Sequence, residues 1–539
     1  MHHGSKNFDV TAPRSRFYQG GFGRIFADLD PWAPEGVPDH QLEEHFLKFA
    51  SEEMVEFPGK KPEEIIISDS TADAGNPNSP LNSAMPSGYV YFGQFIDHDL
   101  TLDVTPLSDA ELDPNRLHNF RTPRLDLDCL YGMGPDAQPH LYQHDSTTGA
   151  FTGKLLVTPI TGPDLGTLAG KLFDLQRNSE GKALIGDPRN DENSIVAQIH
   201  LAFTLAHNKL VDIAFSKAPA GKPISATEAF NQARKTLRWL YQWIVWNDFL
   251  MRIADKGVHN AALARKKQAD GRHIWKPGYD DVYSWKNQPF MPLEFSVAAY
   301  RFGHSMVRNA YQTNVRKPPA GVGVFFPIFN KNHSSDLISG KPLDVRRVLQ
   351  WDWFFQMKSS VQNFPQRARK IDTKLSNALM FLSEDPQSPA DPTKVLNVLA
   401  ARNLTRGVRM KLPSGPDVAR HLGVPVVALN AKEPETLWYY ILKEAEQTGG
   451  NHLGDVGSII VCATFAGILK GDPLSWFNQQ PLWSPNDDPL LKDQSFNEDG
   501  GNKGNPQWGF PAIIRMSGLP FDGSLFFVPQ PAPPQPVTA

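Results

Sequence analysis

The sequence predicts a mainly α-helical protein with long loops and little β-structure. Apolar residues recur at helical spacing in eight long segments, whereas the alternating pattern of strands is scarce. Connections rich in proline, glycine and aspartate separate these segments, and no internal repeat divides them. We therefore expect one large helical domain. The expected helices cover residues 89–100, 192–216, 226–255, 293–308, 344–357, 396–411, 435–447 and 457–470.

The two ends of the chain differ in composition from this helical part. Residues 1–85 mix proline, glycine and charged clusters around one helical stretch, 39–57, and are expected to form an arm wrapped on the core. The helical domain is then expected to span residues 86–528. The proline-rich end, 529–539, is expected to be an extended tail.

The bulk composition excludes several classes of function. Lys and Arg number 54 against 58 Asp and Glu, so a net charge of −4 favours neither a nucleic-acid nor an anionic-membrane partner. Two cysteines, Cys129 and Cys462, cannot form a disulfide framework. The most apolar segment, 459–469, is shorter than the about 18 residues of a membrane span and is predicted to be a buried helix.

The first ten residues, MHHGSKNFDV, contain no apolar stretch of the kind found in signal peptides. The compartment is therefore left open between the cytoplasm and export by another route. The oligomeric state is left open as well.

The stretch YFGQFIDHDL places two aspartates around a histidine beside large apolar residues. Gln94, Asp97 and His98 stand at i, i+3 and i+4 and share one helix face. Asp99 is turned about 100° from His98 and must serve a different partner. Because a buried unpaired carboxylate is unfavourable, this cluster is expected to meet a metal, a cofactor or an arginine. In isolation, such a His-Asp pair is also typical of a capping or surface cluster.

The stretch GDPRNDEN opens the next long helix. Arg189 and Glu192 stand three residues apart, and Asn190 or Asp191 can cap the helix that follows. Taken alone, the pair indicates a local ion pair at a helix start. His200 and His207, further along this helix, are typical of buried structural histidines.

Two later segments repeat this spacing. In YRFGH, Arg301 and His304 are three residues apart, and Gly303 would let a flat cofactor approach the backbone closely. In LAARNLTRG, Asn403 and Arg406 again share a helix face. By themselves these two segments fit a core histidine and a solvated basic helix.

The segment TPRLDLDC combines oxygen-bearing side chains with alternating spacing. Thr122, Arg124, Asp126 and Asp128 occupy every second position, so an extended backbone turns them to one side. Together with a third carboxylate, these hard oxygen ligands favour calcium over a transition metal. The spacing is not that of an EF-hand.

Taken together and in this order, the five segments resemble the animal-type haem peroxidases of the peroxidase–cyclooxygenase superfamily. The resemblance runs from about residue 88 to residue 475 and is greatest to the single-domain bacterial members. Its strength lies in five collinear motifs, each of which would be weak alone. It implies a single, mainly helical peroxidase domain that holds haem b between a distal and a proximal helix.

On the distal side, the resemblance assigns a role to each matching residue. His98 would be the acid/base catalyst, with Gln94 beside it over the haem and Arg189 as the catalytic arginine. Asp97 and Glu192 would be the two carboxylates that form esters with the haem.

On the proximal side, His304 would be the axial ligand of the haem iron, with Arg301 in the same cofactor-binding set. Asn403 would accept a hydrogen bond from the His304 imidazole through its side-chain oxygen, and Arg406 would pair with a haem propionate. Asn193 stands where some members have a methionine bonded to the haem, so that sulfonium link cannot form and efficient chloride oxidation is not expected.

The resemblance also implies a calcium site beside the distal helix. Its ligands would be Asp99, Thr122, the carbonyl oxygen of Arg124, Asp126 and Asp128. The family usually has a serine at the position of Asp128 and an aromatic residue at that of Arg124. The extra carboxylate should favour Ca²⁺, and the arginine is acceptable if only its backbone oxygen binds.

The function implied is that of an oxidoreductase, a haem peroxidase that reduces hydrogen peroxide and oxidises small donors. These donors would be halides such as bromide or iodide, thiocyanate, or aromatic compounds. Family members are often exported.

Three alternatives stand beside this reading. A fatty-acid haem dioxygenase of the same superfamily would carry a tyrosine three residues before the proximal histidine, where Arg301 stands; Tyr300 is four residues before it. An HD-type metal-dependent phosphohydrolase would use the pair His98-Asp99 but lacks a coherent set of further ligands. The third is a haem-free, calcium-stabilised adhesion module on the same fold.

Overall fold

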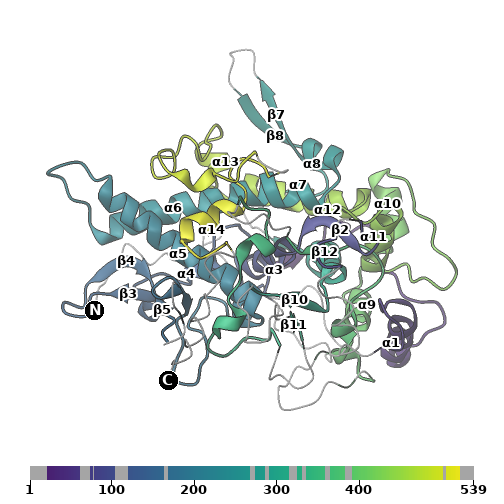
Figure 1. Ribbon diagram of the computed structural model, residues 1–539. Coiled ribbons are helices and arrows are strands. Elements are labelled where there is room, and N and C mark those ends of the chain that lie inside the picture. The colour runs from purple at the N-terminus through teal and green to yellow at the C-terminus, as the bar shows by residue number, and fades with distance from the viewer. Residues whose placement is uncertain are drawn as a thin grey trace, which may run out of the picture.

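The computed structural model describes residues 21–60, 73–76, 78–102, 119–162, 165, 168–267, 273–285, 290–314, 325–329, 336–358, 365–380, 382, 391, 393–501 and 505–522. Within these residues the molecule is mainly helical with a few short strands, so the predicted fold class is confirmed (Figure 1). None of the described helices combines the length and the apolar character that crossing a membrane requires.

Helix α3 (Gly88–Leu100) lies near the centre of the molecule (Figure 1). It packs on α5 (Ser194–Ser216), where the Phe95 ring stacks face to face on the Phe203 ring with the centroids 4.9 Å apart. In turn, α5 contacts α6 (Ala226–Ile244) and α14 (Pro511–Ser517). Because most residues of α5 are buried, this helix holds α3 against the core.

A second group of helices lies on the right of Figure 1 and begins with α9 (Leu399–Arg409). It continues with α10 (Gly415–Leu422), α11 (Leu437–Gln447) and α12 (Asp455–Gly471), which contact one another in sequence order. Helix α1 (Leu42–Glu53) packs on α9. The apolar residues of α12 are almost all buried, as predicted for segment 459–469.

The strands form only two-stranded sheets among the described residues. Strand β1 (Gly21–Gly23) runs parallel to β9 (Phe290–Pro292), and the other pairs are antiparallel. These are β2 (Asn82–Pro86) with β12 (Arg367–Arg369), β3 (Tyr142–His144) with β4 (Phe151–Leu155), β5 (Val157–Pro159) with β6 (Phe173–Leu175), β7 (Leu263–Lys267) with β8 (His273–Pro277), and β10 (Ala310–Gln312) with β11 (Phe325–Pro327).

Most of the predicted long helices are present, with shifts of a few residues at their ends. The predicted helix 226–255 is interrupted by a π-helical turn, Val245–Phe249, before it continues as α7 (Leu250–Ile253). The predicted helix 293–308 is helical but not α-helical: a π-helical turn, Glu294–Ala298, leads into the 3₁₀ helix η8 (Ala299–Met306).

The prediction of a long helix over 344–357 is wrong. This segment forms two short 3₁₀ turns, Val345–Arg347 and Trp351–Trp353, joined by extended residues. The two turns bury Trp351 as fully as a helix would. The spacing of apolar residues indicates which side chains are buried, and here two short turns bury them instead of an α-helix.

The predicted N-terminal arm is described only in part. Strand β1 pairs with β9, and the Trp32 amide donates to the carbonyl oxygen of Leu412 at 2.9 Å, so residues before 85 do contact distant parts of the domain. The boundary at residue 85 stays a prediction. The predicted tail, 529–539, lies outside the described residues.

Candidate active site

A cavity of about 600 Å³ lies between α3 and η8. Its wall includes both histidines singled out in the sequence, His98 from α3 and His304 from η8. The volume is in the range typical of sites for cofactors and other small molecules. Apolar side chains form much of the remaining wall, including Met85, Val90, Phe249, Met306, Ile328, Ile338, Leu379 and Leu399.

Helical geometry explains which polar groups of α3 enter the cavity. Gln94, Asp97 and His98 share one face, as predicted, and all three line the cavity. Asp99 lies outside the cavity lining, on the side of the helix that is turned away, as was also predicted.

His98 is held as a neutral base. Its side chain is buried, and its Nδ1 lies 2.8 Å from Oδ1 of Asn190. Burial lowers the pKa of His98, and the positive charge of Arg189 lowers it further. A neutral imidazole has one bare ring nitrogen, so His98 can accept a proton from a ligand in the cavity.

The remaining distal groups form a hydrogen-bonded chain along the cavity wall. The Asn193 side-chain nitrogen donates to the Gln94 oxygen at 3.0 Å, and the Gln94 nitrogen donates to Glu192 at 3.1 Å. Asp97 accepts from the Thr101 hydroxyl at 3.0 Å. Both carboxylates that the resemblance assigned to ester links therefore line the cavity, although sequence spacing alone indicated an ion pair for Glu192.

The side chain of Asn193 also caps helix α5. Its oxygen accepts from the amides of Ile195 and Val196, whereas its nitrogen faces the cavity chain. The prediction that Asn190 or Asp191 caps this helix is therefore wrong: these residues belong to a separate 3₁₀ turn, η5 (Pro188–Asp191).

On the opposite segment, His304 projects from η8 into the same cavity. In a 3₁₀ helix residues i and i+3 nearly eclipse, which places Arg301 beside His304. Burial lowers the pKa of His304 well below its usual range, and the charges of Arg301 and Arg402 add to this effect. A neutral imidazole is the form that binds a metal.

Asn403 on α9 meets His304 as predicted, but with its other end. Its nitrogen lies 2.8 Å from His304 Nδ1, and its oxygen accepts from Arg301 Nη1 at 3.2 Å. The prediction that the Asn403 oxygen accepts a hydrogen bond from the His304 imidazole is therefore not met in this structure. The physical reason is that a guanidinium can only donate, so Arg301 occupies the oxygen.

The space beside Gly303 fits a bound group. Gly303 lines the cavity, and a Cβ placed on it would meet no protein atom within 4 Å. The backbone there adjoins the cavity rather than packed side chains, in agreement with the close approach of a flat ligand predicted from the sequence.

Arg189, which was expected over the haem, is not among the cavity-lining residues. Its Nη2 ion-pairs with Asp187 at 2.7 Å and donates to the carbonyl oxygens of His98 and Thr101 at 3.0 and 2.5 Å. The fully buried Asp187 holds it there. Arg189 thus acts on His98 through the helix backbone and through its charge.

On α9, Arg402 lines the cavity, whereas Arg406 is not among the cavity-lining residues. The predicted pairing of Arg406 with a propionate stays a prediction. Arg402 was missed because only the face shared by Asn403 and Arg406 was considered. The basic character of the segment was the signal that could have found it.

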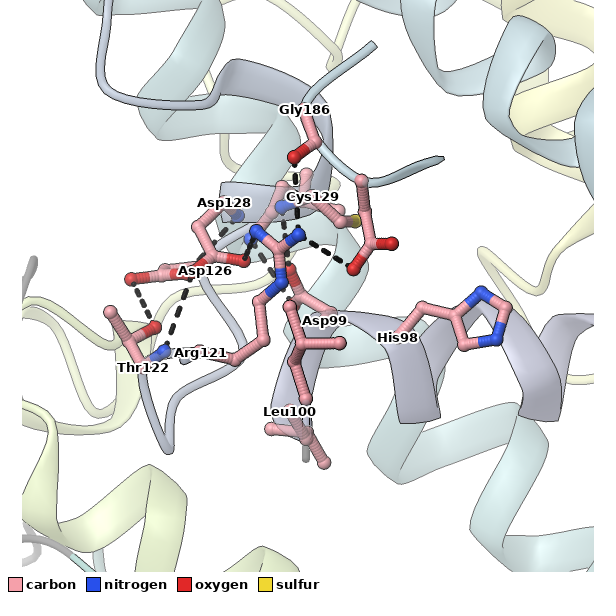
Figure 2. Close-up of polar contacts among 12 residues, drawn as sticks. His98, Asp99, Leu100, Arg121, Thr122, Asp126, Asp128, Cys129 and Gly186 are labelled. Carbon is pink, nitrogen blue, oxygen red and sulfur yellow. Dashed lines mark hydrogen bonds and ion pairs between the residues drawn. The ribbon is translucent and has the colours of Figure 1, made fainter. Parts of the chain in front are cut away.

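The acidic cluster predicted beside α3 is present. Oxygen atoms of Asp99, Asp126 and Asp128 all lie within 4.8 Å of one another, and Figure 2 shows their side chains converging. Thr122 joins them, since its hydroxyl donates to Asp126 at 3.0 Å. Burial raises the pKa of Asp99 to about 7, with the nearby charge of Asp126 adding to it. Burial also raises the pKa of Asp126 and of Asp128.

The side chain of Arg124 leaves this cluster. Its Nε lies 3.9 Å from Asp472. Ligation by its backbone oxygen stays a prediction. Arg121 was missed by sequence reasoning: it ion-pairs with Asp128 at 3.4 Å and with Asp187 at 2.6 Å. Because Asp187 also ion-pairs with Arg189, a network of ion pairs and hydrogen bonds runs from the cluster to the carbonyl oxygen of His98.

The phosphohydrolase alternative finds no support in this geometry. It needs His98 and Asp99 to bind one metal, but His98 lines the cavity and Asp99 belongs to the acidic cluster. In the part of the chain that the structure describes, that cluster is the group capable of holding a metal, and it contains no histidine.

Comparison with known sequences decides the family. The sequence model of the animal haem peroxidase family matches residues 105–321, a segment that contains Arg189 and His304. A peroxidase-like protein of Margaritifera margaritifera is 28% identical over 247 residues, which are 42% of this chain and 26% of that protein. Thyroid peroxidase of Mus musculus is 27% identical over 205 residues, 36% of this chain and 20% of that protein. The chain therefore matches about a quarter or less of the length of these relatives.

Peroxidase A of Dictyostelium discoideum has the same fold over 95% of this chain and 98% of its own, with a TM-score of 0.54 and 15% identity. The chain belongs to the animal-type peroxidase–cyclooxygenase superfamily. The fatty acid α-dioxygenase of Oryza sativa has the same fold as well. The match covers 96% of this chain and 85% of that protein, with a TM-score of 0.52 and 14% identity.

The burial of the Arg189 ion pair predicts a large effect on stability. In this superfamily member, Arg189→Leu should lower the free energy of unfolding by about 3 kcal/mol, because a buried carboxylate and two carbonyl oxygens lose a donor. Urea denaturation would measure the change.

The control is Arg346→Leu. Arg346 ion-pairs with Asp344 at the same sequence spacing and the same 2.7 Å, but its side chain is 62% exposed. Its loss should change stability by less than about 1 kcal/mol. Equal effects of the two substitutions would contradict the role assigned to Arg189.

Proposed function

We propose that this chain is a haem peroxidase that reduces hydrogen peroxide and oxidises small donors. The observation that carries the proposal is one cavity lined by two neutral histidines from different elements, His98 and His304. His98 has its Nδ1 engaged by an amide oxygen, which suits a base. His304 follows Gly303, beside which the cavity is open, and lies among cationic side chains.

The residues present fit haem b. His304 would be the axial ligand through Nε2, and Arg301 and Arg402 are the cationic wall residues that would pair with the propionates. Ligation through Nε2 leaves the proton on Nδ1, which requires Asn403 to present its oxygen to His304. Haem binding should therefore turn the Asn403 side chain over and take Arg301 from it. Bound haem supplies the iron that exchanges electrons with peroxide and donor.

The distal residues would move the protons. The bare nitrogen of His98 takes a proton from one oxygen of hydrogen peroxide and returns it to the other, which leaves as water. Gln94 and Asn193 orient the ligand in the same wall. Two electrons and two further protons complete the reduction to a second water, and the small donors supply the electrons. Because position 193 is not a methionine, bromide, iodide, thiocyanate or aromatic donors are proposed rather than chloride.

The rival proposal is a fatty-acid dioxygenase. Tyr300 lines the cavity, and its hydroxyl donates to the carbonyl oxygen of Gly93 at 3.3 Å. Yet the position three residues before His304 is Arg301, which is engaged with Asn403. Oxygen uptake driven by a fatty acid, abolished by Tyr300→Phe, would favour the dioxygenase; peroxide consumption that survives Tyr300→Phe would favour the peroxidase.

Substitutions of the two histidines should impair the protein in different ways. His304→Ala should lose haem, because it removes the axial ligand, whereas His98→Ala should keep haem and react with peroxide at least about 100-fold more slowly. The Soret band measures the first effect and stopped-flow absorbance the second. His207→Gln, a buried histidine outside the cavity wall, is the control. Normal haem content in His304→Ala would refute the assignment of the axial ligand.

The two distal carboxylates should attach the haem during turnover. Asp97 and Glu192 line an apolar cavity, where an ester carries no charge and avoids the penalty of a desolvated carboxylate. After peroxide treatment, haem should stay with the polypeptide in acid-organic extraction. Asp97→Asn and Glu192→Gln should each remove one attachment, as mass spectrometry of haem peptides would show. Wild-type haem that remains fully extractable after many turnovers would disprove the ester links.

We propose calcium as the occupant of the acidic cluster, with Asp99, Asp126, Asp128, Thr122 and the carbonyl oxygen of Arg124 as ligands. A hard dication would offset three carboxylates, two of them buried and one partly buried, that otherwise repel one another. Chelation should therefore lower the melting temperature, since a ligand at 100 times its Kd contributes about 2.7 kcal/mol. Added calcium should restore it. Asp126→Asn/Asp128→Asn should melt at one temperature with or without chelator, and a wild-type protein equally indifferent to chelation would remove calcium from the proposal.

A further inference from the structure

Three buried side chains from three elements form a chain of hydrogen bonds that ends at His98. His98 Nδ1 lies 2.8 Å from the Asn190 oxygen, and the Asn190 nitrogen lies 3.1 Å from His200 Nδ1. Asn190 is fully buried, and the two histidines are 4% and 2% exposed. This series of hydrogen bonds includes Asn190 and His200, to which the sequence pattern assigned only capping and structural roles.

The directions of these hydrogen bonds are fixed by what each group can do. An amide nitrogen only donates, so His200 Nδ1 must be the bare, accepting nitrogen. The amide oxygen of Asn190 only accepts, so His98 Nδ1 must carry a proton and donate it. A neutral His98 then has its other nitrogen, Nε2, unprotonated.

The surroundings hold each member in place. Asn190 belongs to the 3₁₀ turn η5, in which its backbone amide donates to the Asp187 carbonyl at 3.1 Å. The His200 ring contacts Phe95 edge-on, with the centroids 6.1 Å apart. Burial lowers the pKa of His200 to about 4, which keeps its Nδ1 available as an acceptor near neutral pH.

We propose that Asn190 and His200 are positioning residues that select the His98 tautomer with a bare Nε2. The inference rests on the proposed function, in which that nitrogen takes the proton from peroxide. His200 is essential because an asparagine can turn end for end. With nothing to accept from its nitrogen, Asn190 could present that nitrogen to His98, and the proton would then move to Nε2, where it blocks the reaction.

The test compares four haem-loaded proteins: wild type, His200→Phe, Asn190→Asp/His200→Phe, and the control His207→Phe. A phenylalanine at position 200 keeps a ring against Phe95 but cannot accept. An aspartate at position 190 has two oxygens and no donor, so it presents an acceptor to His98 whichever way it turns. His207 is on the same helix, is fully buried and has a pKa lowered to about 4, but it bonds to Tyr131 and Gly153.

Two rates are measured by stopped flow, the reaction with hydrogen peroxide and the binding of cyanide. Hydrogen cyanide must also give up its proton to a bare distal nitrogen, so it reads the tautomer without any turnover. His200→Phe should slow both by at least about tenfold, a part of the usual contribution of a general base. The double variant should return to within about threefold of wild type, whereas His207→Phe should stay near wild type throughout.

The rescue separates the proposal from a structural role. If His200→Phe reacts at the wild-type rate, or if Asn190→Asp/His200→Phe is as slow as His200→Phe, the proposal is wrong. Haem content and melting temperature are measured for each variant. Should a variant fail to fold, the wild type decides: the ¹⁵N histidine spectrum of its diamagnetic carbon monoxide complex must show His98 protonated at Nδ1, and the opposite tautomer overturns the inference.

The proposed function can fail separately. A wild-type protein that binds no haem or does not react with peroxide removes the peroxidase. The ¹⁵N spectrum of that protein would still show whether Asn190 and His200 fix the tautomer of His98.

Discussion

The rotation of about 100° between His98 and Asp99, two adjacent residues of helix α3, is the constraint on which the rest of the structure depends. Successive residues of an α-helix point about 100° apart, so two adjacent polar side chains must serve two different environments. His98 enters the cavity, and Asp99 enters the acidic cluster. Neither site can be moved or reshaped without shifting the end of α3 that carries the other.

Charged side chains behind α3 reinforce this coupling. Arg121 bridges Asp128 and Asp187, and Asp187 holds Arg189 against the carbonyl oxygens at the end of the helix. Burial would raise the pKa of Asp187, but the hydrogen bond and charge of Arg189, followed by the charge of Arg121, hold it below its usual range. A carboxylate that stays ionised in the interior fixes both arginines. These contacts connect the acidic cluster to the end of helix α3 that carries His98.

The two histidines of the cavity are kept neutral by the same means and prepared for different tasks by their partners. Burial and nearby arginines lower the pKa of both. An amide oxygen faces Nδ1 of His98, which leaves the opposite nitrogen basic, whereas an amide nitrogen faces Nδ1 of His304. In the proposed haem protein, ligation through Nε2 of His304 would require Asn403 to present its oxygen to Nδ1 instead.

The sequence by itself determined the helical class, the face shared by Gln94, Asp97 and His98, and the turn of Asp99 away from that face. These features follow from local geometry, because side chains three or four residues apart on a helix always lie together. Contacts between distant segments were decided only by the tertiary structure. Local spacing could pair Arg189 with Glu192, but the competition between a buried Asp187 and an open cavity turned its guanidinium away. The link from His200 through Asn190 to His98 likewise depends on three elements meeting in the core, and no pattern within any one of them records where the others will lie.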